Sequence, residues 1–96
     1  MTEFEWDPLK ARANVAKHGV SFDEAAQVWK DPDYVVYPED VVDNEQRWHA
    51  IGRVGLVALL LVVHIYRGDP DDERVRIISA RRATPRERRV YDSESG

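Results

Sequence analysis

The spacing of hydrophobic residues changes once along the chain, from a helical period to a strand period. Apolar residues recur three or four positions apart in the segment 8–30, as at Leu9, Ala13 and Ala16, which places them on one face of a helix. After this segment the pattern changes to short alternating or continuous apolar runs, at residues 34–37, 47–54, 56–67 and 74–80. These runs have the length and composition of strands. A short alternation at residues 4–6 predicts a further strand ahead of the helices.

Helix start and stop signals divide the helical part of the chain in two and add a helix near the end. The signals are Asp7 before Pro8, Gly19, a capping box at Ser21 and Glu24, and a second box at Thr84 and Glu87. A capping box satisfies backbone donors that the first helical turn leaves unpaired, and glycine accepts the left-handed conformation that ends many helices. The second helix is expected to run through Val28 and Trp29 to Asp31-Pro32.

The order of elements is therefore one strand, two helices, three or four strands and one helix. Connections of hairpin length between the later strands, such as the turn at residues 68–72 and the glycine at 55, favour a mainly antiparallel sheet. We predict a single α+β domain over residues 1–96, with the two N-terminal helices on one face of the sheet and the last helix at an edge. Residues 92–96 are expected to fray.

Composition excludes several kinds of chemistry. The 96 residues include no cysteine, so disulfides, thiolate metal sites and a cysteine nucleophile are absent. The three histidines do not have the spacing of a known metal motif, and no glycine-rich phosphate loop is present. We therefore predict neither metal nor cofactor. The longest apolar run, at residues 56–66, is shorter than the ~20 residues of a membrane-spanning helix.

Acidic and basic residues occupy separate segments of a chain whose formal net charge is −4. Residues 31–45 carry six acids and no base, residues 69–73 add four acids, and residues 74–91 hold seven arginines and one acid. A basic surface of this kind can hold a phosphate chain even on an acidic protein.

Strand alternation predicts where the basic residues gather. Arg47, His49, Ile51 and Arg53 share one face of their strand, as do Val62, His64 and Tyr66 of the next strand, and Arg74 and Arg76 of the last. If these sets lie on one side of the sheet, they form a cationic surface with two imidazoles and an aromatic ring, which suits single-stranded nucleic acid.

Each of the candidate residues also has a simpler interpretation. An arginine-rich helix is commonly a solvated face, His64 fits a hydrogen-bonded core position, His18 fits a helix C-terminus, and Trp29 and Tyr91 fit core anchors.

RNA cleavage matches the residue types available. The 2′-hydroxyl beside each phosphate is a built-in nucleophile, so the reaction needs a base, an acid and fixed cations around phosphorus. Histidine and arginine serve these roles.

Several motifs resemble one family of bacterial proteins. The segments "FEWD", "KHGVSFDEA", "RWHAIG", "LLLVVHIYR" and "RIISARRATPRERRVY" are similar, in the same order, to the BrnT toxins of type II toxin–antitoxin pairs. The resemblance covers residues 3–91. It implies a RelE-like fold, a cytoplasmic ribonuclease that inhibits translation, and a BrnA-like antitoxin that binds operator DNA and carries the toxin to it. The matching positions are Lys17, His18, Arg47, Arg67, Arg81, Arg82, Glu87 and Tyr91.

We therefore predict a metal-independent endoribonuclease with RNA and an antitoxin as partners and no membrane association. Arg67 and Arg81, at the ends of adjacent predicted strands, are expected to converge on one phosphate. The proton-transfer candidates are His64 and His49, with Lys17, His18 and Tyr91 in reserve, and the RNA-binding candidates are Arg47, Arg53, Arg74, Arg76 and Arg82. Two alternatives remain: a non-enzymatic nucleic-acid-binding protein, and a subunit whose basic face only docks an antitoxin.

Overall fold

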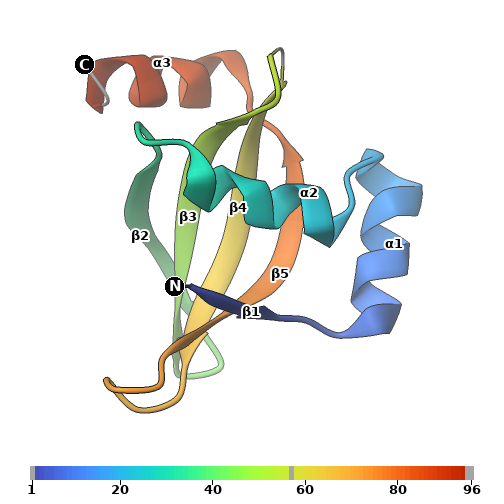
Figure 1. The fold of residues 1–96 in the computed structure, drawn as a ribbon, viewed down its shortest axis with the longest axis vertical. Coiled ribbons are helices and arrows are strands. Elements are labelled where there is room, and N and C mark those ends of the chain that lie inside the picture. Colours follow the sequence, from blue (N-terminus) through green and yellow to red (C-terminus); the bar gives the residue numbers. More distant parts are fainter. Residues whose placement is uncertain (1, 57, 95–96) are drawn as a thin grey trace.

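A computed structural model describes residues 2–56 and 58–94 as a five-stranded sheet with helices on both faces (Figure 1). The elements in chain order are β1 (Glu3–Glu5), α1 (Pro8–His18), α2 (Phe22–Ala26), the 3₁₀ helix η1 (Gln27–Lys30), β2 (Val35–Val42), β3 (Glu45–Val54), β4 (Ala58–Arg67), β5 (Arg74–Arg82) and α3 (Pro85–Glu94). The sheet order is β1-β5-β4-β3-β2. Strand β1 is parallel to β5, and the other pairs are antiparallel. The predicted α+β class and mainly antiparallel sheet are confirmed.

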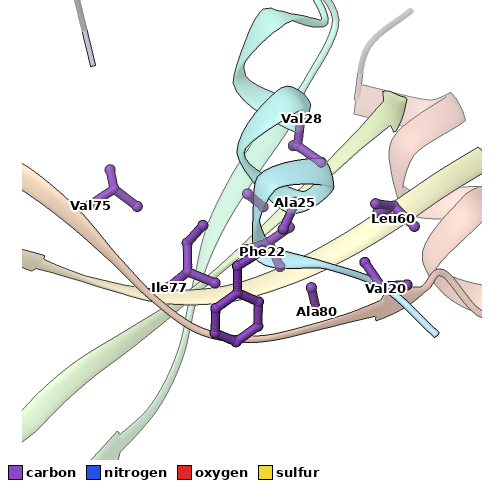
Figure 2. Close-up of a cluster of buried hydrophobic side chains, with 10 residues drawn as sticks. Val20, Phe22, Ala25, Val28, Leu60, Val75, Ile77 and Ala80 are labelled. Atoms are coloured by element: carbon purple, nitrogen blue, oxygen red, sulfur yellow. The ribbon is translucent and has the colours of Figure 1, made fainter. Parts of the chain in front are cut away.

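The first face of the sheet carries the larger core, beneath the N-terminal helices. Figure 2 shows Phe22 and Ala25 of α2 and Val28 of η1 in one cluster with residues of β4 and β5, among them Leu60, Val75, Ile77 and Ala80. The approach is close at Gly52 of β3, where a Cβ atom would lie 2.7 Å from Cγ1 of Val28. A larger residue at 52 would therefore push η1 away from the sheet. The buried Asn14 fixes α1 by accepting a hydrogen bond from the Ala80 amide at 3.1 Å and donating to the Ala80 and Val20 carbonyls at 2.8 and 2.9 Å.

Both predicted ends of α1 and the predicted start of α2 are confirmed. The Asp7 side chain accepts from the amide of Leu9, Gly19 has a φ of 69° at the end of α1, and the Ser21–Glu24 capping box is complete. The expected second helix is shorter than predicted, however. It is α-helical only to Ala26, and residues 27–30 continue as the 3₁₀ helix η1. Both parts keep Ala25 and Val28 on the core.

The second face carries a smaller core of Ile51, Leu59, Leu61 and Tyr91, and α3 packs on this end of the face. The last helix therefore covers part of a face, and its predicted place at an edge is wrong. Apolar positions on both sides of β3 and β4 explain the difference, because a second apolar patch requires its own cover. Helix α3 continues through Glu94; residues 95 and 96 of the predicted frayed tail lie outside the described residues.

Strand bounds differ by a residue or more from the sequence pattern, most of all in β2. Strand β2 runs to Val42 instead of ending near residue 37, with an irregular register between Pro38 and Val41. Proline is tolerated there because β2 is the edge strand. Strand β4 begins at Ala58, while Leu56 is 95% exposed in the preceding turn; Val57 lies outside the described residues.

Candidate active site

Basic side chains from three strands lie on the open part of the second face. We call this surface the basic face, and it consists of Arg47 and His49 of β3, Arg67 of β4, and Arg74, Arg76 and Arg81 of β5. The strand registers place them there. His49 pairs with Val63, Arg76 with Ile65 and Arg81 with Leu61, and Leu61 belongs to the second core. Because side chains alternate along a strand, residues two apart stay on the same face. The predicted face of Arg47, His49, Ile51 and Arg53 is found.

Most arginines of the basic face are held by carboxylates. Glu5 accepts from Nε of Arg74 and from Nη1 of Arg76, both at 2.7 Å, and this pairing lowers the pKa of Glu5. Arg81 and Glu87 share two hydrogen bonds of 2.7 and 2.9 Å, and the pKa of Glu87 falls to about 2 chiefly because of them. Arg67 lies 3.7 Å from Glu45. These contacts fix the directions of the guanidinium groups.

Arg47 differs from its neighbours. Within residues 2–56 and 58–94 its side chain has no carboxylate partner, and its buried Nε has no hydrogen-bond acceptor. Continuing the β3–β4 register by one residue from the Trp48–His64 pair places Arg47 beside Ile65, whose other neighbour is Arg76. A buried, unpaired donor on a cationic surface is costly unless an anion binds there. The position of Arg47 therefore suits a phosphate.

His49 lies between Arg47 and Arg81 on this face and contacts Tyr37 of β2. Its Nδ1 is 3.3 Å from the Tyr37 hydroxyl and 3.8 Å from Oε1 of Glu39. Burial lowers the pKa of His49, opposed by the negative charges of Glu39 and Glu87. Burial also raises the pKa of Tyr37, with Glu87 adding to the effect. At neutral pH the pair consists of a largely neutral imidazole and a protonated phenol, which suits proton transfer.

Tyr37 was missed by sequence reasoning. The signal was present in the alternation of Val35 and Tyr37, but the pairing of β2 with β3 was needed to place Tyr37 opposite His49. That register depends on the turn at Asp43 and Asn44, where both residues have positive φ.

His64 does not lie on the basic face. The prediction that His64 and His49 share one face as proton-transfer groups is therefore wrong. It pairs with Trp48 across the strands, which places it on the first face, where it is fully buried with its ring centroid 4.9 Å from that of Trp29. Nδ1 lies 3.3 Å from the Val62 carbonyl, and Nε2 lies 3.3 Å from the Tyr66 hydroxyl. Burial lowers the pKa of His64 to about 4. The side chain is a neutral core residue.

Arg67 and Arg81 do not converge either. Arg67 pairs with Arg74, whereas Arg81 pairs with Leu61, so the two arginines lie six residues apart along β4. At about 3.3 Å per residue this is roughly 20 Å. The sequence-based expectation overlooked that antiparallel strands bring the end of one strand next to the start of the other. Arg67 and Arg81 cannot hold the same phosphate.

The remaining candidates lie around α3 and α1. Tyr91 is buried, and its hydroxyl donates to Oδ2 of Asp31 at 2.6 Å, while Cζ of Arg53 lies 5.9 Å from the Tyr91 ring centre. Tyr91 and Arg53 therefore hold α3 against the sheet.

Arg82 pairs with Leu60 of the first core, on the face opposite Arg81. Lys17 and His18 occupy the last turn of α1, and in the described part of the chain neither has a hydrogen bond or ion pair with the basic face.

Comparison with known proteins identifies the family. The family model described as the ribonuclease toxin BrnT of type II toxin–antitoxin systems matches residues 6–87. The chain belongs to the BrnT family of ribonuclease toxins. The crystal structure of the ribonuclease toxin BrnT from Brucella abortus superposes with a TM-score of 0.68 at 26% identity, covering 88% of this chain and 99% of that one. No curated protein matches the chain.

Membership of the BrnT family directs attention to the basic face, because a ribonuclease toxin must hold a polyanion. Among the described residues no group of histidines and carboxylates could hold a metal ion. No helix in residues 2–56 and 58–94 is long and apolar enough to cross a membrane.

Proposed function

We propose that this chain is a metal-independent endoribonuclease that inhibits translation, and that a BrnA-like antitoxin neutralises it. The observation that carries the catalytic part is the alignment of Arg47, His49 and Arg81 on one open face, with Arg47 unpaired in the described part of the chain. A phosphate at Arg47 would lie next to the imidazole of His49, because side chains two residues apart on a strand are neighbours.

The chemistry assigns each group a role. His49 takes the proton of the 2′-hydroxyl, and the 2′-oxygen bonds to phosphorus. The bond to the 5′-oxygen breaks, and that oxygen leaves with a proton from water, giving a 2′,3′-cyclic phosphate. Arg47 stabilises the charge on the phosphoryl oxygens, and Arg81, which lies farther along the face by register, is proposed to hold an adjacent phosphate. Tyr37 positions His49 through the contact at Nδ1, which leaves Nε2 to face the substrate. Since RNA supplies its own nucleophile, fixed cations can take the place of a metal.

The remaining basic residues extend the surface along the chain of the substrate. Arg74 and Arg76 lie farther from His49 than Arg47 does and are proposed to contact flanking phosphates. We propose that His64 and Tyr91 do not touch RNA, since both are buried in the cores. We further propose that the protein acts in the cytoplasm as a single domain and reaches operator DNA only through its antitoxin.

Cleavage by the purified protein in excess chelator tests the proposal. We expect products with 2′,3′-cyclic phosphate or 3′-phosphate ends. Activity that disappears with the chelator, or products with 5′-phosphates, would overturn the mechanism. RNA binding without cleavage would favour the non-enzymatic alternative, and absence of RNA affinity would favour the antitoxin-docking alternative.

A growth experiment tests the toxin–antitoxin part of the proposal. Expression of the chain alone in a bacterium should arrest growth, and co-expression of the small protein encoded beside it should restore growth.

A further inference from the structure

The first face of the sheet has an aromatic pocket on the side opposite the basic face. This surface pocket of about 370 Å³ is lined by Thr2, Trp29, Tyr34, Tyr66, Glu73 and Val75. Tyr34 is 39% exposed, and its ring centroid lies 6.1 Å from that of Trp29 of η1. The pocket plays no part in the proposed cleavage, because His49 lies on the other face.

The pocket combines aromatic rings with negative charge. Tyr34, Tyr66 and Glu73 line the same pocket. Burial raises the pKa of Tyr66, and the charges of Tyr34 and Glu73 raise it further. The adjoining turn adds the exposed acids Asp69, Asp71 and Asp72. No lysine, arginine or histidine is among the residues that line the pocket. Aromatic faces attract cations, and a carboxylate beside them offers the cation a charge-assisted hydrogen bond.

The charge also decides against a nucleobase as the occupant. The same rings could stack on a base, but the phosphates attached to that base would lie against the acidic turn at residues 69–73. Like charges at close range oppose such binding. A cationic side chain fits both the rings and the carboxylate.

We propose that the aromatic pocket is a docking site for an arginine side chain of a protein partner. Guanidinium groups suit the site because they are planar, stack on aromatic rings and pair with a carboxylate. The proposal rests on one part of the proposed function, namely that a protein partner binds this chain. It implies that such a partner can hold the toxin from the face that RNA does not use.

The test uses the intact chain and a short blocked tri-arginine peptide as the probe. Binding is followed by the NMR signal of the Trp29 indole, with a tri-citrulline peptide as the neutral control. We expect Tyr34→Ala and Glu73→Gln each to weaken arginine-peptide binding, by roughly 2-fold to 30-fold. Tyr34→Phe, which keeps the ring, should bind as the unchanged protein does. Asp71→Asn is the matched control, since Asp71 lies in the same acidic turn but does not line the pocket.

The outcomes separate the pocket from simple charge attraction and from RNA binding. The proposal is overturned if Asp71→Asn weakens arginine-peptide binding as much as Glu73→Gln does while Tyr34→Ala has no effect. That result would indicate general attraction to an acidic surface. Equal binding of the citrulline peptide, or no binding of either peptide, would also overturn it. The proposal is equally wrong if a single-stranded RNA oligonucleotide shifts the Trp29 signal or if Tyr34→Ala reduces RNA cleavage. Failure of the proposed ribonuclease activity would appear separately, as absence of cleavage by a protein that still binds the arginine peptide.

Discussion

Arg81 and Glu87 face each other through two hydrogen bonds, from Nη1 to Oε1 at 2.7 Å and from Nη2 to Oε2 at 2.9 Å. The same carboxylate accepts from the amide of Thr84 at 2.9 Å, and the Thr84 hydroxyl accepts from the amide of Glu87 at 3.2 Å. Glu87 therefore closes the capping box of α3 and orients an arginine of the basic face. This shared contact links the fold of the last helix to the proposed active site.

A matched pair of substitutions at Glu87 separates these two roles. Glu87→Gln can keep the capping box but loses the charge that holds Arg81, so RNA cleavage should fall and the stability that comes from the ion pair should be lost. Glu87→Ala should lower the free energy of unfolding by about 1 kcal/mol more, because the cap is lost as well. Urea unfolding and a cleavage assay measure the two effects. Asp92→Asn, on the exposed side of α3, should change neither; equal stability of the two Glu87 variants would contradict the capping role.

The buried His64 should make stability depend on pH. Its folded pKa of about 4 lies below the ordinary value of 6.5, so the unfolded chain binds more protons between these values. The contribution of neutral His64 is complete above pH 6.5, and stability falls as the pH drops toward 4, by at most about 3 kcal/mol. His64→Gln cannot titrate and should flatten the curve of unfolding free energy in this window. An unchanged slope in the variant would show that other groups cause the dependence.

Much of this fold could be predicted because its signals are local. The capping residues, the glycine at 19 and the period of the apolar residues each act within a few positions of the chain. Pairing between strands is not local, and here prediction was incomplete. The face of His64 and the distance between Arg67 and Arg81 depend on how β3, β4 and β5 align, and Tyr37 becomes a neighbour of His49 only through the β2–β3 register. The sequence therefore indicated the types of residue in the site more reliably than their arrangement.

Arg47 should matter for RNA and not for folding. Arg47→Met keeps much of the apolar stem that lies beside Ile65 and removes a buried donor that has no acceptor among the described residues. We expect unfolding free energy to stay the same or rise, while cleavage falls about 100-fold to 1,000-fold, as for loss of a charge-stabilising donor. Thermal unfolding and a cleavage assay with a defined RNA measure these effects. Arg12→Ala, on the exposed face of α1, is the control, and cleavage reduced equally in both variants would remove Arg47 from the site.

His49 should affect the chemical step more than binding. His49→Gln is expected to lower kcat about 100-fold to 10,000-fold, as for loss of a general base, with KM changed little. Tyr37→Phe should have a smaller effect on kcat and should shift the pH profile, because the Tyr37 hydroxyl contacts Nδ1 of His49. Single-turnover kinetics across pH 5 to 9, roughly the range around the imidazole transition, test both variants. Full activity of His49→Gln would assign the base to another residue.

Glu5 offers a test of the basic face in which affinity is expected to rise. Its carboxylate lies between Arg74 and Arg76 and neutralises part of their charge. Glu5→Gln should leave both guanidinium groups in place on β5 while removing the negative charge that opposes a phosphate. We expect tighter RNA binding and a steeper dependence of affinity on salt, with the slope changing by about 0.7 for each additional phosphate of a single strand that the protein neutralises. Arg74→Ala and Arg76→Ala should change the slope in the opposite direction. If all three variants bind RNA with the slope of the unchanged protein, the phosphates do not pass over this part of β5, and the path of RNA is confined to Arg47, His49 and Arg81.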